Sequence, residues 1–153
     1  MVFRKAKISD VKYIHQMINT AAARGEMLPR SLMDLYSYLR DYFVYCLDDG
    51  KTVIGVCAMH IFWENLAEVR SLFVDEAYRR QGIATRLVEA CISEAITLDL
   101  YRIFTLTNQR EFFQSLDFHE VDKSMLPEKI WSECMKCPKY PDYCDEIPMI
   151  MEP

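Results

Sequence analysis

The chain has 153 residues, of which 51% are hydrophobic and 27% are charged, and its formal net charge is -5 at pH 7. This length and composition predict one folded domain spanning residues 1–153, and they exclude a disordered chain. The acidic balance argues against general nucleic-acid binding, so an acidic substrate would need locally placed arginines or lysines.

The N-terminal part predicts a strand followed by two helices. A strand is expected at residues 2–6. The N-terminal residues lack the apolar segment that a signal peptide would have. Ser9 is the expected N-cap of the first helix, and Gly25 is expected to end it. Ser31 starts a capping-box pattern for a short second helix at residues 32–39. The apolar residues at helical spacing on one face of the first helix are Val11, Ile14, Met17, Ile18, Ala21 and Ala22.

The middle of the chain predicts an antiparallel meander. Three runs rich in β-branched and aromatic residues, at 42–47, 52–62 and 68–74, are separated by turn signals at 48–51 and 64–65. Adjacent strands joined by such short turns pair with each other.

The rest of the chain alternates helices and strands. The expected elements are a helix at 84–98, a strand at 101–107, a helix at 108–116, a strand at 118–121, a short helix at 127–134 and a strand at 146–151. This order predicts an α/β fold, in which a mixed sheet carries helices on both faces. Apolar runs fall short of the ~18–20 residues of a membrane span. We therefore expect a cytoplasmic protein whose partners include neither membranes nor nucleic acids.

The most informative motif is Arg79-Arg80-Gln81-Gly82-Ile83-Ala84, between a predicted strand and a predicted helix. Glycine lets a ligand approach the backbone closely, and a helix start presents unsatisfied N–H groups to an anion. The two arginines add positive charge. The motif is therefore suited to hold a pyrophosphate, although an ordinary arginine-rich surface turn would look similar. In this setting, Arg-x-x-Gly-x-Ala resembles the acyl-CoA pyrophosphate loop of the GNAT family of N-acetyltransferases.

The resemblance implies the GNAT fold, with a mixed, mostly antiparallel sheet of six to seven strands, and acetyl-CoA as cosubstrate. It also implies that the loop backbone holds the phosphates. The residues concerned are Arg79, Arg80, Gln81, Gly82, Ile83, Ala84 and Thr85.

The same resemblance assigns roles to the strand before the loop. The N–H of Leu72 would face the thioester carbonyl, where attack builds negative charge, and such a donor is typically worth ~3 kcal/mol. Phe73 and Val74 would follow the pantetheine arm. Asn108 would contact the pantetheine, or else act as an N-cap of the next helix. Phe113 would pack against the pantetheine.

Acetyl transfer needs a neutral amine, so a base must take a proton from an ammonium group whose pKa is ~8 to ~10.4. Glu68 lies four residues before Leu72, and strand alternation would put both side chains on the same face. This matches the position of the base in several GNAT enzymes. Glu68 could instead be a strand-edge charge or a partner of Arg70. The general acid stays unassigned, because Phe113 stands where many relatives have tyrosine.

Two arginines are candidates for binding an acceptor carboxylate. Arg70 would share a strand face with Glu68 and Leu72, where it could clamp a substrate or pair with Glu68. Arg24 ends the first helix, and that helix and its following loop line the acceptor cleft in the family. It could equally be a solvated helix-end cation. Lys123 and Lys129 are expected to be surface lysines.

The segment 126–146 resembles the tail of the short, stand-alone N-acetylglutamate synthases. This implies L-glutamate as acceptor, at the first step of arginine biosynthesis, and an enzyme able to form a homodimer. Alternatives are acetylation of another small amine or a peptide N-terminus, or a non-catalytic domain that binds acetyl-CoA.

The six cysteines are expected to be reduced in the cytoplasm. Cys134, Cys137 and Cys144 form a partial metal-binding pattern, but a structural zinc prefers four ligands, so reduced thiols are expected. The residues expected to pack in the interior without a chemical role are Cys46, Cys57, Cys91, His15 and His60.

Overall fold

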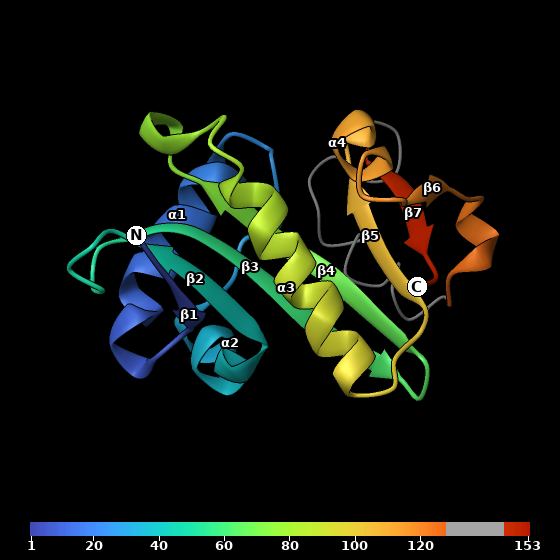
Figure 1. Cartoon of the computed structure of the whole chain (residues 1–153), viewed down its shortest axis with the longest axis horizontal. Helices are drawn as coiled ribbons and strands as arrows, with labels where there is room; N and C mark the ends of the chain where they lie inside the picture. Colours follow the sequence, from blue (N-terminus) through green and yellow to red (C-terminus); the bar gives the residue numbers. More distant parts are fainter. Residues whose placement is uncertain (128–145) are drawn as a thin grey trace.

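The computed structural model describes residues 1–127 and 146–153, whose strands form one seven-stranded sheet (Figure 1). The strands are β1 Val2–Lys5, β2 Tyr42–Cys46, β3 Val53–Trp63, β4 Leu66–Val74, β5 Ile103–Thr107, β6 His119–Glu120 and β7 Ile147–Met151. Their order across the sheet is β1-β2-β3-β4-β5-β7-β6, in which β4 and β5 are parallel and all other neighbours are antiparallel. The predicted mixed, mostly antiparallel sheet is confirmed.

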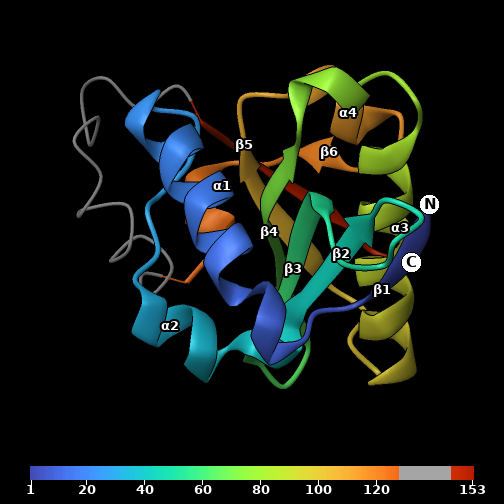
Figure 2. The ribbon, with the colours of Figure 1, turned by 90° about the vertical axis from the view of Figure 1, so that its left-hand side faces the viewer.

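Helices cover both faces of the sheet, as predicted (Figure 2). The helices α1 Val11–Ala23 and α2 Leu32–Ser37 lie on one face, and α3 Ile83–Thr97 lies on the other. The short α4, Arg110–Gln114, adds Phe113 to the α3 side of the core. Short 3-10 turns lie at Ile8–Asp10, Leu39–Asp41, Glu76–Tyr78 and Lys123–Met125.

Each face of the sheet has its own hydrophobic core. On the α3 side, Val69, Leu87 and Cys91 belong to the larger cluster. On the α1 side, Ile14 and Tyr42 belong to the other. The three described cysteines, Cys46, Cys57 and Cys91, are buried and free, which confirms their predicted place in the interior. None of the helices within the described ranges is long and apolar enough to span a membrane.

The first helix starts later than the sequence predicts. Ser9 lies inside a 3-10 turn, Ile8–Asp10, and α1 starts at Val11, so the prediction that Ser9 caps this helix is wrong. The reason is the Asp10 carboxylate, which accepts the Lys7 N–H at 2.6 Å and holds the chain in that tight turn.

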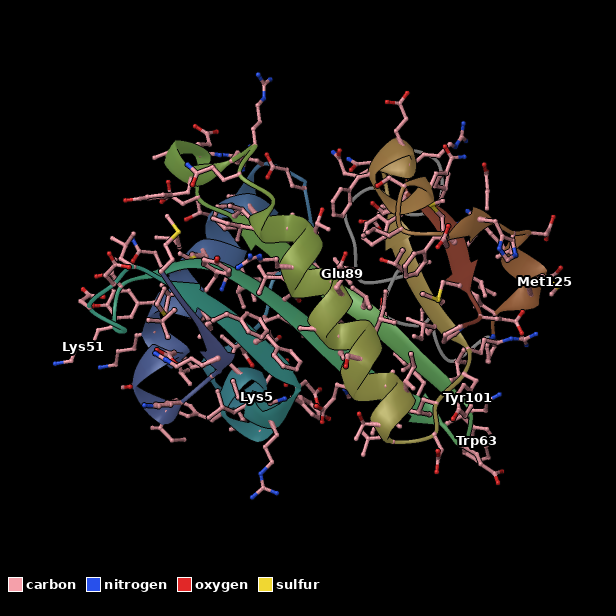
Figure 3. The ribbon with its side chains drawn as sticks, viewed as in Figure 1. Lys5, Lys51, Trp63, Glu89, Tyr101 and Met125 are labelled. Atoms are coloured by element: carbon pink, nitrogen blue, oxygen red, sulfur yellow. The ribbon has the colours of Figure 1, made fainter. Side chains whose placement is uncertain are left out.

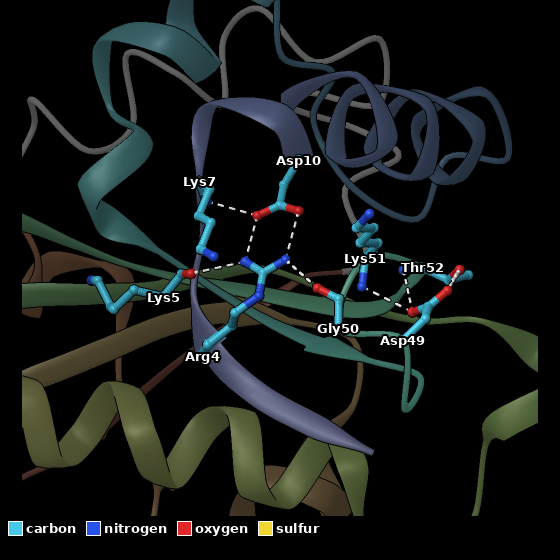
Figure 4. Close-up of polar contacts among 8 residues, drawn as sticks. All are labelled: Arg4, Lys5, Lys7, Asp10, Asp49, Gly50, Lys51 and Thr52. Atoms are coloured by element: carbon cyan, nitrogen blue, oxygen red, sulfur yellow. Dashed lines mark hydrogen bonds and ion pairs between the residues drawn. The ribbon is translucent and has the colours of Figure 1, made fainter.

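Asp10 is also the centre of a buried polar network (Figure 4). The Arg4 guanidinium donates to both Asp10 oxygens, at 2.6 and 3.0 Å, and to the Gly50 carbonyl at 2.9 Å. Burial raises the pKa of Asp10, but the hydrogen bonds from Arg4 and Lys7 outweigh it, so the net pKa is lowered. The network joins β1, the start of α1 and the β2–β3 hairpin.

The predicted roles of Gly25 and Ser31 at helix ends are confirmed, whereas α2 ends at Ser37 and not at residue 39. Gly25 follows α1 with a φ of 73°, a left-handed conformation that suits glycine. The Ser31 hydroxyl accepts the Asp34 N–H at 3.1 Å and caps α2.

The parallel strands β4 and β5 separate after a short contact, and this separation positions the site. Their described pairing covers Ala67 with Ile103 and Glu68 with Phe104. Beyond these pairs the strands diverge toward the end where α3 begins (Figure 1). At the opposite end, Trp63 of the β3–β4 hairpin and Tyr101 lie at one corner, away from the divergence (Figure 3).

Candidate active site

A cavity of about 810 Å³ lies between the diverging strands. Its walls come from β4, from the loop and first turn of α3, from the end of β5 and from the loop after α1. Most residues predicted for the site line it: Glu68, Arg70, Leu72, Phe73, Val74, Arg79, Arg80, Gly82, Ile83, Ala84, Thr85, Asn108 and Phe113. Gln81 and Arg24 do not contribute to the described lining.

The loop before α3 has the backbone conformation that the motif predicts. Gly82 is the N-cap of α3 with a φ of 79°, and Arg80 has a φ of 66°. No described heavy atom lies within 4 Å of a Cβ built at Gly82, so glycine is required there by the backbone conformation and not by lack of space. The N-cap Gly82 makes no side-chain hydrogen bond to this helix, and Gly82, Ile83, Ala84 and Thr85 line the cavity.

Arg79 links the loop to the end of β4. Its Nε donates to the Val74 carbonyl at 2.9 Å, and its guanidinium lies 5.8 Å from the centroid of the Phe73 ring. Arg79 also lines the cavity. Positive charge beside a helix start favours an anionic group such as a diphosphate.

A β-bulge in β4 changes which side chains share a face. Val56 of β3 pairs with Phe73, but Ala58 pairs with Arg70, so β4 has an extra residue there, and Ser71 adopts a φ of 59°. Leu72 therefore packs in the α3-side core, whereas Arg70 lies opposite Ala58 of the α1-side core. The prediction that Glu68 and Leu72 share a face is wrong, because simple alternation does not cross a bulge.

Tyr42 of β2 contacts the bulge in β4 through Ser71. Its side chain is buried and hydrogen-bonds the side chain of Ser71. Burial raises the pKa of Tyr42, and the Ser71 hydrogen bond opposes that rise only in part. The strained residue that precedes Leu72 is thus anchored to a fully buried side chain of β2.

Glu68 and Arg70 form an ion pair at the floor of the cavity. Their closest atoms, Arg70 Nη1 and Glu68 Oε1, are 3.4 Å apart, and each side chain is 8% exposed. The pairing that the sequence left open is therefore present. Both groups also line the cavity, so a ligand can contact either one.

Arg24, the second candidate arginine, does not lie in the cavity. Arg24 is half exposed, lies 3.5 Å from Glu76 and stays outside the main cavity. Arg30, in the loop after α1, lines the cavity instead. The loop after α1 thus borders the cavity as expected, but through Arg30 and not through Arg24.

The wall of the cavity at the end of β5 contains residues that the sequence analysis did not predict. The Thr105 hydroxyl donates to the Val69 carbonyl at 2.8 Å, where β4 and β5 part, and the Thr107 hydroxyl accepts the Gln109 N–H at 2.8 Å. Gln109, and not Asn108, is the N-cap of α4, so the capping alternative for Asn108 is wrong. Asn108 lines the cavity.

Some predictions lie outside the described residues. These concern Lys129, the helix at 127–134 beyond residue 127, and the cysteines Cys134, Cys137 and Cys144. Lys123 lies in a 3-10 turn away from the described cavity lining.

The cavity thus joins the start of α3 to a buried carboxylate and to two arginines, one on β4 and one in the α1–α2 loop. A helix start beside arginines suits an anionic ligand group, and a buried carboxylate can take a proton, so the arrangement suits a transferase whose donor carries an anionic group. Comparison with known sequences agrees: residues 12–121 match the acetyltransferase (GNAT) family. The chain belongs to this family, as predicted, and acetyl-CoA is its acetyl donor.

Two relatives are similar over most of their length. An uncharacterized N-acetyltransferase from Chlorobaculum tepidum is 37% identical over 96% of this chain and 93% of its own. An amino-acid acetyltransferase from Mycobacterium tuberculosis is 34% identical over 86% of this chain and 76% of its own. The chain is an N-acetyltransferase.

Solved structures confirm the fold. Rv2747 from Mycobacterium tuberculosis, in complex with CoA and NLQ, matches with a TM-score of 0.86 and 27% identity, over 100% of this chain and 99% of that one. N-acetylglutamate synthase from Neisseria gonorrhoeae, complexed with coenzyme A and N-acetyl-glutamate, matches with a TM-score of 0.87 over 99% of this chain but 34% of its own. At 21% identity, the second match concerns the fold alone.

Proposed function

We propose that the enzyme acetylates the α-amine of an amino acid, with L-glutamate as acceptor, and so acts at the entry to arginine biosynthesis. The observation that carries the proposal is the presence of Arg30, Arg70 and Glu68 in one cavity with the start of α3. Glutamate has two carboxylates and one amine, which match two guanidinium groups and one carboxylate. The names of the relatives that are amino-acid acetyltransferases also support it.

The proposed roles follow from the chemistry of each group. The N–H groups at the start of α3, with Arg79 and Arg80, hold the diphosphate of acetyl-CoA, and that substrate supplies an electrophilic thioester carbonyl. The Leu72 N–H stabilises the negative charge that develops on the carbonyl oxygen. Arg30 and Arg70 hold the acceptor carboxylates, and Glu68 takes a proton from its ammonium group.

The leaving thiolate has no assigned proton donor. Phe113, at the position where tyrosine was sought, lines the cavity and cannot donate a proton. An ordinary thiol has a pKa of ~8.5, so the thiolate is a weak enough base to leave unprotonated and to take up a proton from solvent afterwards. We therefore expect activity without a dedicated general acid.

The acceptor is tested by incubating the protein with acetyl-CoA and an equimolar mixture of glutamate, glutamine, aspartate, ornithine and a short peptide. Mass spectrometry of the products should show N-acetylglutamate as the main product. A different main product would overturn the glutamate proposal but leave the family assignment intact.

The proposed binding of an acceptor carboxylate by Arg30 is tested with Arg30→Gln. Loss of a charge-assisted hydrogen bond should raise KM for glutamate on the order of 10- to 100-fold and leave KM for acetyl-CoA unchanged. Arg24→Gln is the matched control, because Arg24 lies outside the cavity and pairs with Glu76. An equal rise in KM for both variants would contradict the role of Arg30.

A further inference from the structure

His60 was expected to pack without a chemical role, but it lies beside the proposed base and has a carboxylate partner. Its Nδ1 is 2.7 Å from Asp41 Oδ2, and its Cα pairs directly with that of Glu68 across β3 and β4. We propose that His60, held by Asp41, relays to solvent the proton that Glu68 takes from the acceptor amine. The proposal rests on the proposed function of Glu68.

The reaction releases a proton in each cycle, so Glu68 needs a route by which its proton reaches solvent. An ammonium group that becomes an amide loses two protons: one ends on the sulfur of CoA, and the other is released to solvent. Glu68 must return to its carboxylate form in each cycle, yet the residue is 6% exposed. Its open side is the cavity, and the two bound substrates occupy that cavity during turnover.

The register of the sheet places His60 next to Glu68. Directly opposed residues of an antiparallel pair project from the same face with Cβ atoms ~4.5–5.5 Å apart. The side chains of His60 and Asp41 are 20% and 21% exposed, so both are more accessible than that of Glu68. The three residues therefore form a path from the floor of the cavity to the surface beside Leu39–Asp41.

Neighbouring groups define how His60 can carry a proton. The Asp41 carboxylate can only accept, so Nδ1 carries the hydrogen of this contact, and Nε2 is left to accept a second proton. The imidazolium that forms then holds Asp41 at Nδ1 and is the cross-strand neighbour of Glu68. Arg70 pairs with the same Glu68 carboxylate. The rings of Tyr38 and Phe62 meet the imidazole edge-on, each with a centroid separation of 5.1 Å, and hold its plane.

The relay transfers protons without breaking any other bond. The Glu68 carboxylic acid passes its proton to Nε2 of His60 and becomes a carboxylate again. The imidazolium then loses a proton to water at the surface and returns to the neutral form. Asp41 keeps its hydrogen bond to Nδ1 throughout.

The relay is tested with two variants of His60, using acetyl-CoA and the best acceptor from the amine panel. His60→Asn keeps an N–H donor for Asp41 but has no second nitrogen to accept a proton. We expect kcat to fall on the order of 10- to 100-fold, with KM for both substrates and the melting temperature little changed. In His60→Gly, added imidazole should restore kcat at least in part, which a merely structural role would not produce.

Two controls separate this proposal from the proposed function. His119→Asn removes an exposed histidine of β6 that lies outside the described cavity lining, and it should have wild-type kcat. Glu68→Gln tests the base itself: wild-type turnover in this variant would overturn the proposed function of Glu68. If Glu68→Gln is slow but His60→Asn has wild-type kcat, or imidazole fails to restore His60→Gly, the relay is wrong and the base assignment stands.

Discussion

At the scale of single residues, the contact between Tyr42 and Ser71 has a consequence for catalysis. Ser71 has a left-handed backbone, which is costly for a residue with a Cβ, and it directly precedes the proposed oxyanion donor Leu72. Tyr42→Phe leaves the Ser71 hydroxyl without this buried partner. We expect kcat to fall about 5- to 10-fold, since a lost buried hydrogen bond is worth ~1 kcal/mol, while KM for the acceptor stays the same.

Steady-state kinetics and thermal unfolding measure this effect. Tyr36→Phe is the control, because Tyr36 is exposed on α2. A fall in melting temperature without a change in kcat would mean that Tyr42 only stabilises the fold and does not position Leu72.

Single residues also show how far the sequence could predict the site. Glu68 and Arg70 could be predicted because both lie on the strand that contains Leu72, and the structure places both in the cavity. Arg30 was missed because its place depends on how the α1–α2 loop folds back over the sheet, which local pattern does not encode. Ser71 could not be found either, since serine does not carry the turn signature of glycine or asparagine.

At the scale of elements, the loop and first turn of α3 form one unit. Gly82→Ala adds a methyl group that contacts no described atom, so its effect arises from the φ of 79°, at a cost of ~1–2 kcal/mol. The variant relieves this strain by shifting the first turn, which moves the N–H groups away from the diphosphate. We expect the Kd for CoA, measured by calorimetry, to rise about tenfold.

Gly50→Ala is the matched control for this prediction. Gly50 has a φ of 68° and an equally open Cβ site, but it lies in the β2–β3 hairpin. Both variants should lose similar stability, whereas Gly50→Ala should bind CoA as the wild type does. Equal CoA affinity in the two variants would count against the loop as the phosphate site.

Elements also show which parts of the fold were predictable. The meander β2–β3–β4 follows from alternating apolar residues and short turns, and the structure confirms it. The bulge in β4 was not predicted, because the residue with the left-handed backbone is Ser71 and not a glycine, so the sequence of the strand does not mark it. The position of β7 between β5 and β6 was not predicted, because order along the chain does not determine order across a sheet.

At the scale of the whole molecule, the Arg4–Asp10 network joins β1, α1 and the β2–β3 hairpin. Asp10→Asn leaves the partly buried Arg4 guanidinium without its carboxylate, and we expect a loss of about 3 kcal/mol in the free energy of unfolding at pH 7. Because the folded pKa of Asp10 is lowered, its contribution is complete above its unfolded pKa of ~3.9 and is lost as the pH falls through the folded pKa.

Urea unfolding followed by circular dichroism, from pH 7 down to pH 3, measures this difference. The wild type and Asp10→Asn should converge in acid. Glu120→Gln removes the exposed Arg110–Glu120 pair, whose atoms are 2.9 Å apart, and should cost less than ~1 kcal/mol. A gap between wild type and Asp10→Asn that persists unchanged at pH 3 would contradict the ionic origin of the effect.

The place of β7 has a consequence for how the protein is made. Of the seven strands, β7 is translated last, yet it fills an interior position and provides the hydrogen bonds to both β5 and β6. Until residues 147–151 leave the ribosome, the wall of the cavity formed by β5 has no partner on its outer edge. The β5 wall of the cavity is therefore completed only when the last strand of this sheet has been made, and a nascent chain stalled before Ile147 would expose an unpaired β5 edge to aggregation.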